Sequence, residues 1–537
     1  MSRLIGRTVG PAWRAALAAV LVALGADLAR PAEPGTAPPA AAGTMVAPEA
    51  LYREHCAACH GEQRTGGMGP ALLPESLERL RRAESLQVIG NGRPATQMPG
   101  FGDRLSKDEI AALAAWITTP VQPAPAWTED NIRASRVVAA DAAKLPHKPV
   151  WRADPMNLFV VVEGGDHHVS LVDGDRFEVV HRFASRYALH GGPKFSPDGR
   201  FVYFGSRDGW ITKYDLWNLT VVAEVRAGLN MRNIAVSADG KWVLAANYFP
   251  HTLALFDAGL NLVKTFAATT RDAQASSRVS AVYDAAPRRS FIVALKDLPE
   301  LWEIGYDAKI KPGADGAGAD GGKAAFHAVR RIDLDASLDD FFFDPAYRHA
   351  LGATRPKDGV LPKAQVVDLD QRRTIAELPI AGMPHLGSGI TFAWNGTTLL
   401  ASPNLKDGAL DVIDTRSWKP VKTIATPGPG FFLRSHEATP YAWTDSMMSP
   451  AAKDTLTIID KRTLQAVAQV REPGRTLSHI EFTKDGRYAL ASLYENDGAL
   501  IVYDAATFKE VKRLPMSKPV GKYNVWNKIT RSEGTSH

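Results

Sequence analysis

The stretch 195-FSPDGRFVYFGSRDGWITKYDLWNLTVVAEV-225 alternates short apolar runs with turn residues. It is typical of four short strands, with an Asp-Gly turn near the start and an Asp at the end of the third strand. The same order begins again at 236 and 482, and weaker copies begin near 283, 343, 392 and 436. Residues 158–183 supply one further unit. A period of about 40–50 residues is the range in which one repeat forms one blade of a β-propeller.

These repeats count to eight, so the sequence predicts an all-β, eight-bladed propeller over residues 151–537. We expect the ring to close through the C-terminal "KYNVWNK" (522–528), which would supply a strand to the first blade. The Gly/Ala/Asp-rich stretch 311–323 is predicted to be a loop insertion.

A different pattern precedes the propeller. Cys56 and Cys59 are the only cysteines of the chain, and His60 follows them in "CAACH". This C-x-x-C-H spacing is the attachment signature of a c-type heme, in which both thiols bind the macrocycle and the His ligates iron. A chance match or a redox C-x-x-C pair is the alternative. The neighbouring residues favour heme, so we expect an all-α cytochrome c domain over 46–120.

The sixth ligand of that iron is predicted to be Met98. "QMPGFGDRLSKDEI" (97–110) resembles the Met-Pro-x-Phe loop of class I cytochromes c, in which the Met sulfur binds iron. Ser106 and Glu109 form a capping-box pattern at the start of the helix that follows. Met68 and His55 are the competing candidates.

The N-terminus has the pattern of a signal peptide, predicted over 1–29. Arg3, Arg7 and Arg14 precede or open the apolar stretch 15–26. An uncleaved anchor is the alternative. Pro-rich linkers are predicted at 30–45 and 121–150. Because bacteria attach c-type heme outside the inner membrane, we expect a periplasmic protein without a membrane span after cleavage. A net charge of +5 and no Lys/Arg block give no indication of nucleic-acid binding.

Four histidines are candidates for a site on the propeller: His190, His385, His436 and His479. Each is expected in or near a loop between the last strand of one blade and the first strand of the next. Such loops converge over the central channel, so four histidines at equivalent places predict a shared ligand pocket. Any one of them alone is better explained as a hydrogen-bonded loop residue.

Residues 46–530 resemble the d1-heme propeller family, which comprises cytochrome cd1 nitrite reductase and relatives in heme d1 biogenesis. "YALHGGPKFSPDGRFVYFGSRDGWITKYDLW" (187–217) resembles the segment that carries the family's proximal histidine. The resemblance implies that His190 ligates the heme d1 iron. It also implies that Arg207, Arg232 and Tyr248 contact the macrocycle and its carboxylates.

"MPHLGSG" (383–389) resembles the family's distal loop, which would place His385 over the other face of the ring. His436 is expected to contact the same ligand from the shared pocket. Nitrite reductases of the family have two distal histidines, and Asp339 occupies the position of the first one in this chain. Nitrite reduction is therefore not expected. The family member without a cytochrome c domain is excluded by CAACH.

The resemblance then implies the branch that oxidises dihydro-heme d1 to heme d1, converting a propionate into an acrylate. His385 is the expected base, and His479 is expected to orient the substrate carboxylate or relay the proton. Heme c would pass electrons to an external acceptor, and cytochrome cd1 nitrite reductase is the expected recipient of heme d1. A nitrite reductase with a relocated proton donor and a non-catalytic heme d1 carrier are the alternatives. A carrier would not need heme c.

Overall fold

The computed structural model describes residues 47–67, 69–77, 80, 82–92, 98–189, 191–307, 327–354 and 364–534. Residues from Val46 onward form one compact unit. The predicted signal peptide (1–29), the first linker (30–45) and the predicted insertion (311–323) lie outside the described residues. No helix in the described ranges is both long and apolar enough to cross a lipid bilayer.

The first part of the chain is helical, as predicted. Its helices are α1 (Pro48–His55), α2 (Ala57–His60), α3 (Pro74–Leu77), α4 (Arg82–Asn91) and α5 (Lys107–Trp116). The Ser106 hydroxyl accepts the Glu109 N–H, and the Glu109 carboxylate accepts the Ser106 N–H, so the predicted capping box starts α5. Leu51 and Tyr52 of α1 pack against Leu113 of α5 in a buried apolar cluster that holds these helices together.

The strands that follow form eight antiparallel sheets among the described residues, which confirms the eight-bladed propeller. From the innermost strand outward, the first four sheets are β33 (Pro519–Asn524), β2 (Leu158–Glu163), β3 (His168–Asp173) and β4 (Glu178–Ala184); β5 (Lys194–Phe195), β6 (Phe201–Gly205), β7 (Trp210–Asp215) and β8 (Thr220–Arg226); β9 (Asn230–Val236), β10 (Trp242–Phe249), β11 (Thr252–Asp257) and β12 (Leu262–Ala267); and β13 (Val279–Ala285), β14 (Ser290–Leu295), β15 (Glu300–Gly305) and β16 (Val329–Asp333).

The remaining four sheets have the same order. They are β17 (Asp340–Phe343), β18 (His349–Ala353), β19 (Ala364–Asp368) and β20 (Arg373–Leu378); β21 (Ile390–Trp394), β22 (Thr397–Pro403), β23 (Ala409–Asp414) and β24 (Lys419–Ala425); β25 (Leu433–Arg434), β26 (Tyr441–Asp445), β27 (Thr455–Asp460) and β28 (Gln465–Arg471); and β29 (Leu477–Phe482), β30 (Tyr488–Leu493), β31 (Gly498–Asp504) and β32 (Glu510–Met516). Short 3₁₀ helices are η1 (Pro155–Asn157), η2 (Ala286–Arg288) and η3 (Leu386–Ser388).

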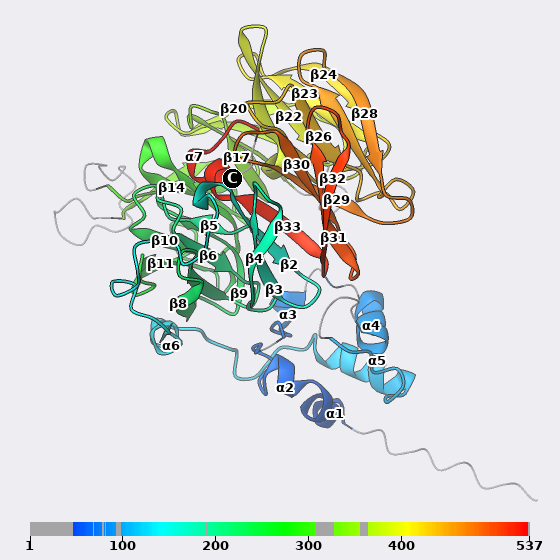
Figure 1. Ribbon diagram of the computed structural model, residues 1–537. Coiled ribbons are helices and arrows are strands. Elements are labelled where there is room, and N and C mark those ends of the chain that lie inside the picture. Colours follow the sequence, from blue (N-terminus) through cyan, green and yellow to red (C-terminus); the bar gives the residue numbers. More distant parts are fainter. Residues whose placement is uncertain are drawn as a thin grey trace, which may run out of the picture. The chain divides into compact units, whose positions relative to one another are not determined.

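The ring closes through β33, the last strand of the chain, which pairs with β2 in the first sheet. In Figure 1 the red β33 lies beside β2, although more than 350 residues separate them in sequence. Closure through the C-terminus was predicted, but the predicted strand 522–528 continues beyond the observed one. Residues Val525–Thr530 form helix α7, because the Asn524 side chain accepts the Asn527 N–H and caps a new helix.

The segment predicted as the second linker, 121–150, contains two regular elements. Helix α6 (Glu129–Ala134) begins with a capping box of Thr128 and Asn131, and its Ile132 is buried in the core of the second and third sheets. Strand β1 (Val137–Val138) then adds to the outer edge of the second sheet by pairing with β8. The segment 121–150 therefore packs along the propeller, through burial of Ile132 and pairing of β1 with β8.

Each sheet has two ends, and the site depends on which end a loop occupies. We call the end at which every innermost strand begins the upper face. Loops that join consecutive sheets, and loops between the second and third strands of a sheet, lie on this face because successive strands are antiparallel. The other two kinds of loop lie on the lower face.

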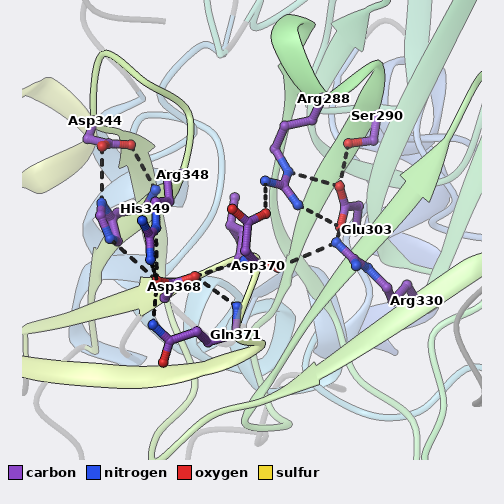
Figure 2. Close-up of polar contacts among 11 residues, drawn as sticks. Arg288, Ser290, Glu303, Arg330, Asp344, Arg348, His349, Asp368, Asp370 and Gln371 are labelled. Carbon is purple, nitrogen blue, oxygen red and sulfur yellow. Dashed lines mark hydrogen bonds and ion pairs between the residues drawn. The ribbon is translucent and has the colours of Figure 1, made fainter. Parts of the chain in front are cut away.

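A buried ionic network joins the fourth and fifth sheets (Figure 2). The Glu303 carboxylate of β15 accepts hydrogen bonds from Arg288, Arg330 and Ser290. Arg288 also pairs with Asp370, which follows β19, at 2.6 Å. Glu303 is 4% exposed. Burial opposes its ionisation, but the two arginines outweigh burial and keep the pKa of Glu303 below its ordinary value.

We expect Glu303→Gln to reduce the free energy of unfolding by about 3 kcal/mol, because it removes a buried carboxylate that two partly buried arginines share. The full difference in stability between wild type and variant should appear above the ordinary pKa of Glu. The difference should shrink as the pH falls through the lowered pKa that Glu303 has in the folded protein, because the wild-type carboxylate is then protonated as well. Thermal melts between pH 3 and 7 measure both effects. Glu178→Gln is the control, because Glu178 is 67% exposed and lies 3.9 Å from Lys512. Equal melting temperatures for the two variants would contradict the prediction.

Candidate functional site

The C-x-x-C-H motif lies at the junction of α1 and α2, and its histidine is held in one orientation. The Nδ1 atom of His60 is 2.8 Å from the carbonyl oxygen of Pro70. A carbonyl only accepts hydrogen bonds, so Nδ1 carries the proton and Nε2 carries the lone pair that a metal would use. Burial lowers the pKa of His60, which also favours the neutral, ligating form.

Gly69 makes room for this ring. A Cβ atom at residue 69 would lie 2.8 Å from Cε1 of His60, so only glycine leaves the ring in place. The Gly69 N–H donates to the carbonyl of Cys59 at 2.7 Å and ties the loop to the motif. Gly69 therefore supports His60 through both its lack of a side chain and its backbone.

A cavity of about 520 Å³ adjoins the motif. Its volume is within the range of cofactor pockets, and its lining is mainly apolar, which suits a porphyrin. The residues that line it include Cys56, Cys59, His60, Met98 and His55 from the helical part, and Arg207, Tyr248, Arg278 and Tyr187 from the propeller. The residues present thus fit a c-type heme, with two thiols and two candidate axial ligands around one space.

Positive charge gathers around Tyr248 on the upper face. Arg207, Arg278 and Lys296 lie 5.7, 5.9 and 5.8 Å from the centre of the Tyr248 ring. Arg278 is also paired with Asp297 at 2.6 Å, and Lys296 is paired with Asp339. Clustered guanidinium and ammonium groups suit a ligand that carries several carboxylates.

Arg232 on β9 faces a protein carboxylate. Its guanidinium lies 3.2 Å from Asp340, and the Tyr283 hydroxyl donates to the other oxygen of Asp340 at 2.8 Å. Burial alone would lower the pKa of Arg232, but the Asp340 charge raises it above the ordinary value. A Cβ atom at Gly387 would lie 2.7 Å from Asp340, so this carboxylate is next to the loop that carries His385.

His385 precedes η3 in the upper loop between β20 and β21. Its Nδ1 lies 2.8 Å from the carbonyl oxygen of Phe431, and its ring packs on the Phe431 ring at 4.2 Å. Because the carbonyl is the acceptor, Nδ1 carries the proton and the lone pair is on Nε2. His385 is thus arranged to take up a proton at Nε2.

His479 lies in a β-bulge of β29, where the register with β30 shifts between Ser478 and Ile480. Its φ is +42°, a strained value for a residue with a side chain, and strain of this kind is concentrated at functional sites. His479 is 1% exposed, and its Nδ1 has no hydrogen-bond partner among the described residues. Burial, together with the Lys522 and Arg434 charges, holds the pKa of His479 well below its ordinary value.

Comparison with known proteins agrees with this arrangement. The family model "Cytochrome D1 heme domain" matches residues 153–528, and the model "Cytochrome C oxidase, cbb3-type, subunit III" matches 43–117. The chain is 55% identical to a dihydro-heme d1 dehydrogenase of Pseudomonas aeruginosa over 491 residues, which cover 91% of this chain and 95% of that protein. The chain belongs to the dihydro-heme d1 dehydrogenase family.

Two further matches delimit the family. A solved structure described as "Dihydro-heme d1 dehydrogenase NirN in complex with DHE" is 53% identical, with a TM-score of 0.82, and the match covers 90% of this chain and all of that one. A nitrite reductase of Stutzerimonas stutzeri is 26% identical over 574 residues, covering 97% of this chain and 98% of that protein. The resemblance predicted from the sequence is confirmed, and so are its two domain types.

One histidine of this family member lies on the wrong face for the predicted pocket. His436 follows β25, the first strand of its sheet, and precedes β26, so it is on the lower face. It is 2% exposed, and its Nδ1 accepts the Ala438 N–H at 3.0 Å. The prediction that all four histidines lie in or near the loops that join consecutive blades is therefore wrong for His436. The reason is that β25 has only two residues, so the blade begins earlier than the pattern indicates.

His190 and Met68 lie outside the described residues. The two residues after His190 are described, and Gly191 and Gly192 have φ values of +81° and +70°. A Cβ atom at Gly192 would lie 3.1 Å from the Tyr523 ring of the closing strand. Gly191 and Gly192 thus allow the chain to pass close to the closing strand.

The residues that connect His385 with His479 were not predicted from the sequence. Phe432 lies between them, because its ring is 4.7 Å from Phe431 and 4.6 Å from His479. The Asp445 carboxylate accepts the backbone N–H groups of Phe431 and His479. The "GPGFF" sequence at 428–432, with two adjacent aromatic residues after a Gly/Pro turn, could have drawn attention to Phe432. Nothing in the local sequence distinguishes Asp445 from the other aspartates that end strands.

Proposed function

We propose that this chain oxidises dihydro-heme d1 to heme d1 by removing two hydrogens from one propionate side chain. The observation that carries the proposal is the 55% identity with a dihydro-heme d1 dehydrogenase along nearly the whole of both chains. The single imidazole of the 383–389 loop, with its proton fixed on Nδ1, supplies the base that the reaction needs. Formation of the acrylate releases two protons and two electrons from the propionate.

His385 is the proposed general base. Its Nδ1–H is engaged by the Phe431 carbonyl, so a proton removed from the propionate carbon goes to Nε2. His479 is a weaker candidate for this step, because burial and nearby cations disfavour its protonated form. We assign His479 to orientation of the substrate carboxylate as a neutral side chain.

Substrate binding is proposed to use both faces of the macrocycle. His190 would ligate the substrate iron from the segment that the two glycines bring close to the closing strand. Arg207 and Tyr248 would hold carboxylates, with Arg278 and Lys296 in the same positive cluster. Arg232 would contribute while still paired with Asp340. Asp339 is paired with Lys296 and supplies no imidazole, which agrees with a dehydrogenase rather than a nitrite reductase.

One covalent heme c is proposed in the cavity beside α2. Cys56 and Cys59 would attach it, and His60 and Met98 would be its axial ligands; His55 lines the same cavity and is the competitor for Met98. When bound, this group supplies a one-electron acceptor. We further propose a periplasmic location, an external electron acceptor, and cytochrome cd1 nitrite reductase as the recipient of heme d1.

Met98→Ala should lower the reduction potential of heme c, because a thioether ligand favours the reduced iron. Covalent attachment should survive, since both cysteines remain. Potentiometric titration and near-infrared spectra measure the change. Met448→Ala is the matched control, because Met448 is a 46% exposed methionine of the propeller. A sulfur-to-iron charge-transfer band that persists in Met98→Ala would assign the ligand elsewhere.

His385→Ala should bind dihydro-heme d1 with nearly unchanged affinity but convert it about 10²–10⁴ times more slowly, because a general base acts mainly in the transition state. Arg207→Ala should show the reverse balance, since a carboxylate pair acts equally in the ground state and the transition state. Anaerobic titration gives the affinity, and chromatography of the tetrapyrrole gives the rate.

The control for this pair is His349→Ala, a histidine of β18 on the lower face that pairs with Asp344. It should leave both quantities at wild-type values. Conversion at the wild-type rate in His385→Ala would remove His385 from the mechanism and shift the base assignment to His479.

A further inference from the structure

Asp445 is a fully buried carboxylate at the upper end of β26. It accepts the backbone N–H groups of Phe431 at 2.7 Å, Phe432 at 3.3 Å, His479 at 3.3 Å and Met447 at 3.5 Å. All its hydrogen bonds in the described part of the chain come from backbone groups. A buried charge costs free energy unless it is well solvated by the protein, so a fourfold set of donors indicates a site that is built around this carboxylate.

Two of those donors lead directly to the two candidate histidines. The N–H of Phe432 and the carbonyl of Phe431 belong to the same peptide group. Asp445 accepts from that N–H, and His385 Nδ1–H donates to that carbonyl at 2.8 Å. Negative charge at the N–H end polarises the peptide and strengthens its carbonyl as an acceptor, because linked hydrogen bonds reinforce one another. The Asp445 charge therefore acts on His385 through the single peptide group between Phe431 and Phe432.

The second connection is to the bulge of β29. The His479 N–H donates to the same Asp445 oxygen that accepts from Phe432. The carbonyl of His479 accepts from Lys522 of the closing strand β33. The positive φ of His479 is thus maintained from both sides, by a carboxylate of the seventh sheet and the Lys522 amino group of the first. One carboxylate fixes the backbone at both histidines.

The charged groups around Asp445 come from three other strands. Arg434 of β25 and Lys522 of β33 interact electrostatically with Asp445, and both also interact with Glu481 of β29. Burial raises the pKa of Asp445 to about 6, although four N–H groups favour its ionised form. Arg434 is the neighbouring cation that favours the ionised carboxylate, whereas burial holds the pKa of Lys522 well below its ordinary value.

We propose that Asp445 is a positioning residue that orients His385 and His479 together and increases the basicity of His385 through the 431–432 peptide group. The proposal rests on the proposed function, because it assigns Asp445 a role in proton uptake by His385. According to this proposal, the reaction requires the charge of the Asp445 carboxylate as well as the backbone conformation that its hydrogen bonds maintain.

The test compares Asp445→Asn, which keeps the shape but loses the charge and one acceptor oxygen, with Asp445→Glu, which keeps the charge. In Asp445→Asn we expect dihydro-heme d1 affinity within about threefold of wild type and a rate of conversion about tenfold lower. The acidic limb of the rate–pH profile should move to lower pH by about one unit, because loss of a negative charge disfavours the protonated imidazole. In Asp445→Glu the limb should stay at the wild-type pH even if the rate falls.

Asp368→Asn is the matched control. Asp368 is also fully buried and accepts two backbone N–H groups, from Asp370 and Gln371, together with the Arg348 and Gln371 side chains (Figure 2). It lies at the lower end of β19. Asp368→Asn should lower the melting temperature without moving the pH profile. If Asp445→Asn behaves like this control, with stability reduced and the acidic limb unmoved, the charge has no role and the proposal is overturned.

Two outcomes separate this inference from the function on which it rests. If wild-type protein does not convert dihydro-heme d1, the proposed function fails. If wild type converts it and Asp445→Asn has the wild-type rate and profile, only the role of Asp445 fails. Should Asp445→Asn not accumulate as folded protein, Asp445→Glu still decides, because an acidic limb displaced to lower pH in a variant that keeps the charge would contradict the proposal.

Discussion

The pairing of β33 with β2 is the constraint on which the rest of the structure depends. It joins the last strand of the chain to the first sheet and leaves no open sheet edge at that point of the ring. The same strand also supports the site. Lys522 donates to the His479 carbonyl, and Tyr523 packs 5.3 Å from the His479 ring. The strand that closes the ring therefore also positions His479.

In the proposed function, substrate binding and proton removal are assigned to groups on different sheets. Cations gather around Tyr248 and Asp340, in loops and strands of the second to fifth sheets, where they suit the carboxylates of a tetrapyrrole. The candidate base belongs to the loop before the sixth sheet, and its partners belong to the seventh and eighth. A rigid ring of sheets is suited to this division, because each group is held by a different sheet whose position is fixed by its neighbours.

Much of this could be predicted from the sequence, because the signals are local. The repeat of short strands indicated eight sheets, Ser106 and Glu109 indicated the start of α5, and "CAACH" indicated the heme motif. The failures concern contacts between distant residues. His436 was misplaced because β25 has two residues, and Asp445 was missed because its donors are up to 34 residues away, on another sheet. The β-bulge at His479 could not be predicted either, because the alternation of apolar and polar residues in a strand does not reveal a shift in register.

The most direct test of the central claim is the anaerobic reaction of the purified, heme-loaded protein with dihydro-heme d1 and a two-electron dye. Chromatography would measure heme d1 formed, and dye absorbance would measure electrons released. The account predicts one heme d1 formed for each dye molecule reduced, over many turnovers per chain, with no nitrite consumed when nitrite is added. Tetrapyrrole that binds but is recovered unchanged, or sustained nitrite consumption by protein that retains heme d1, would contradict it.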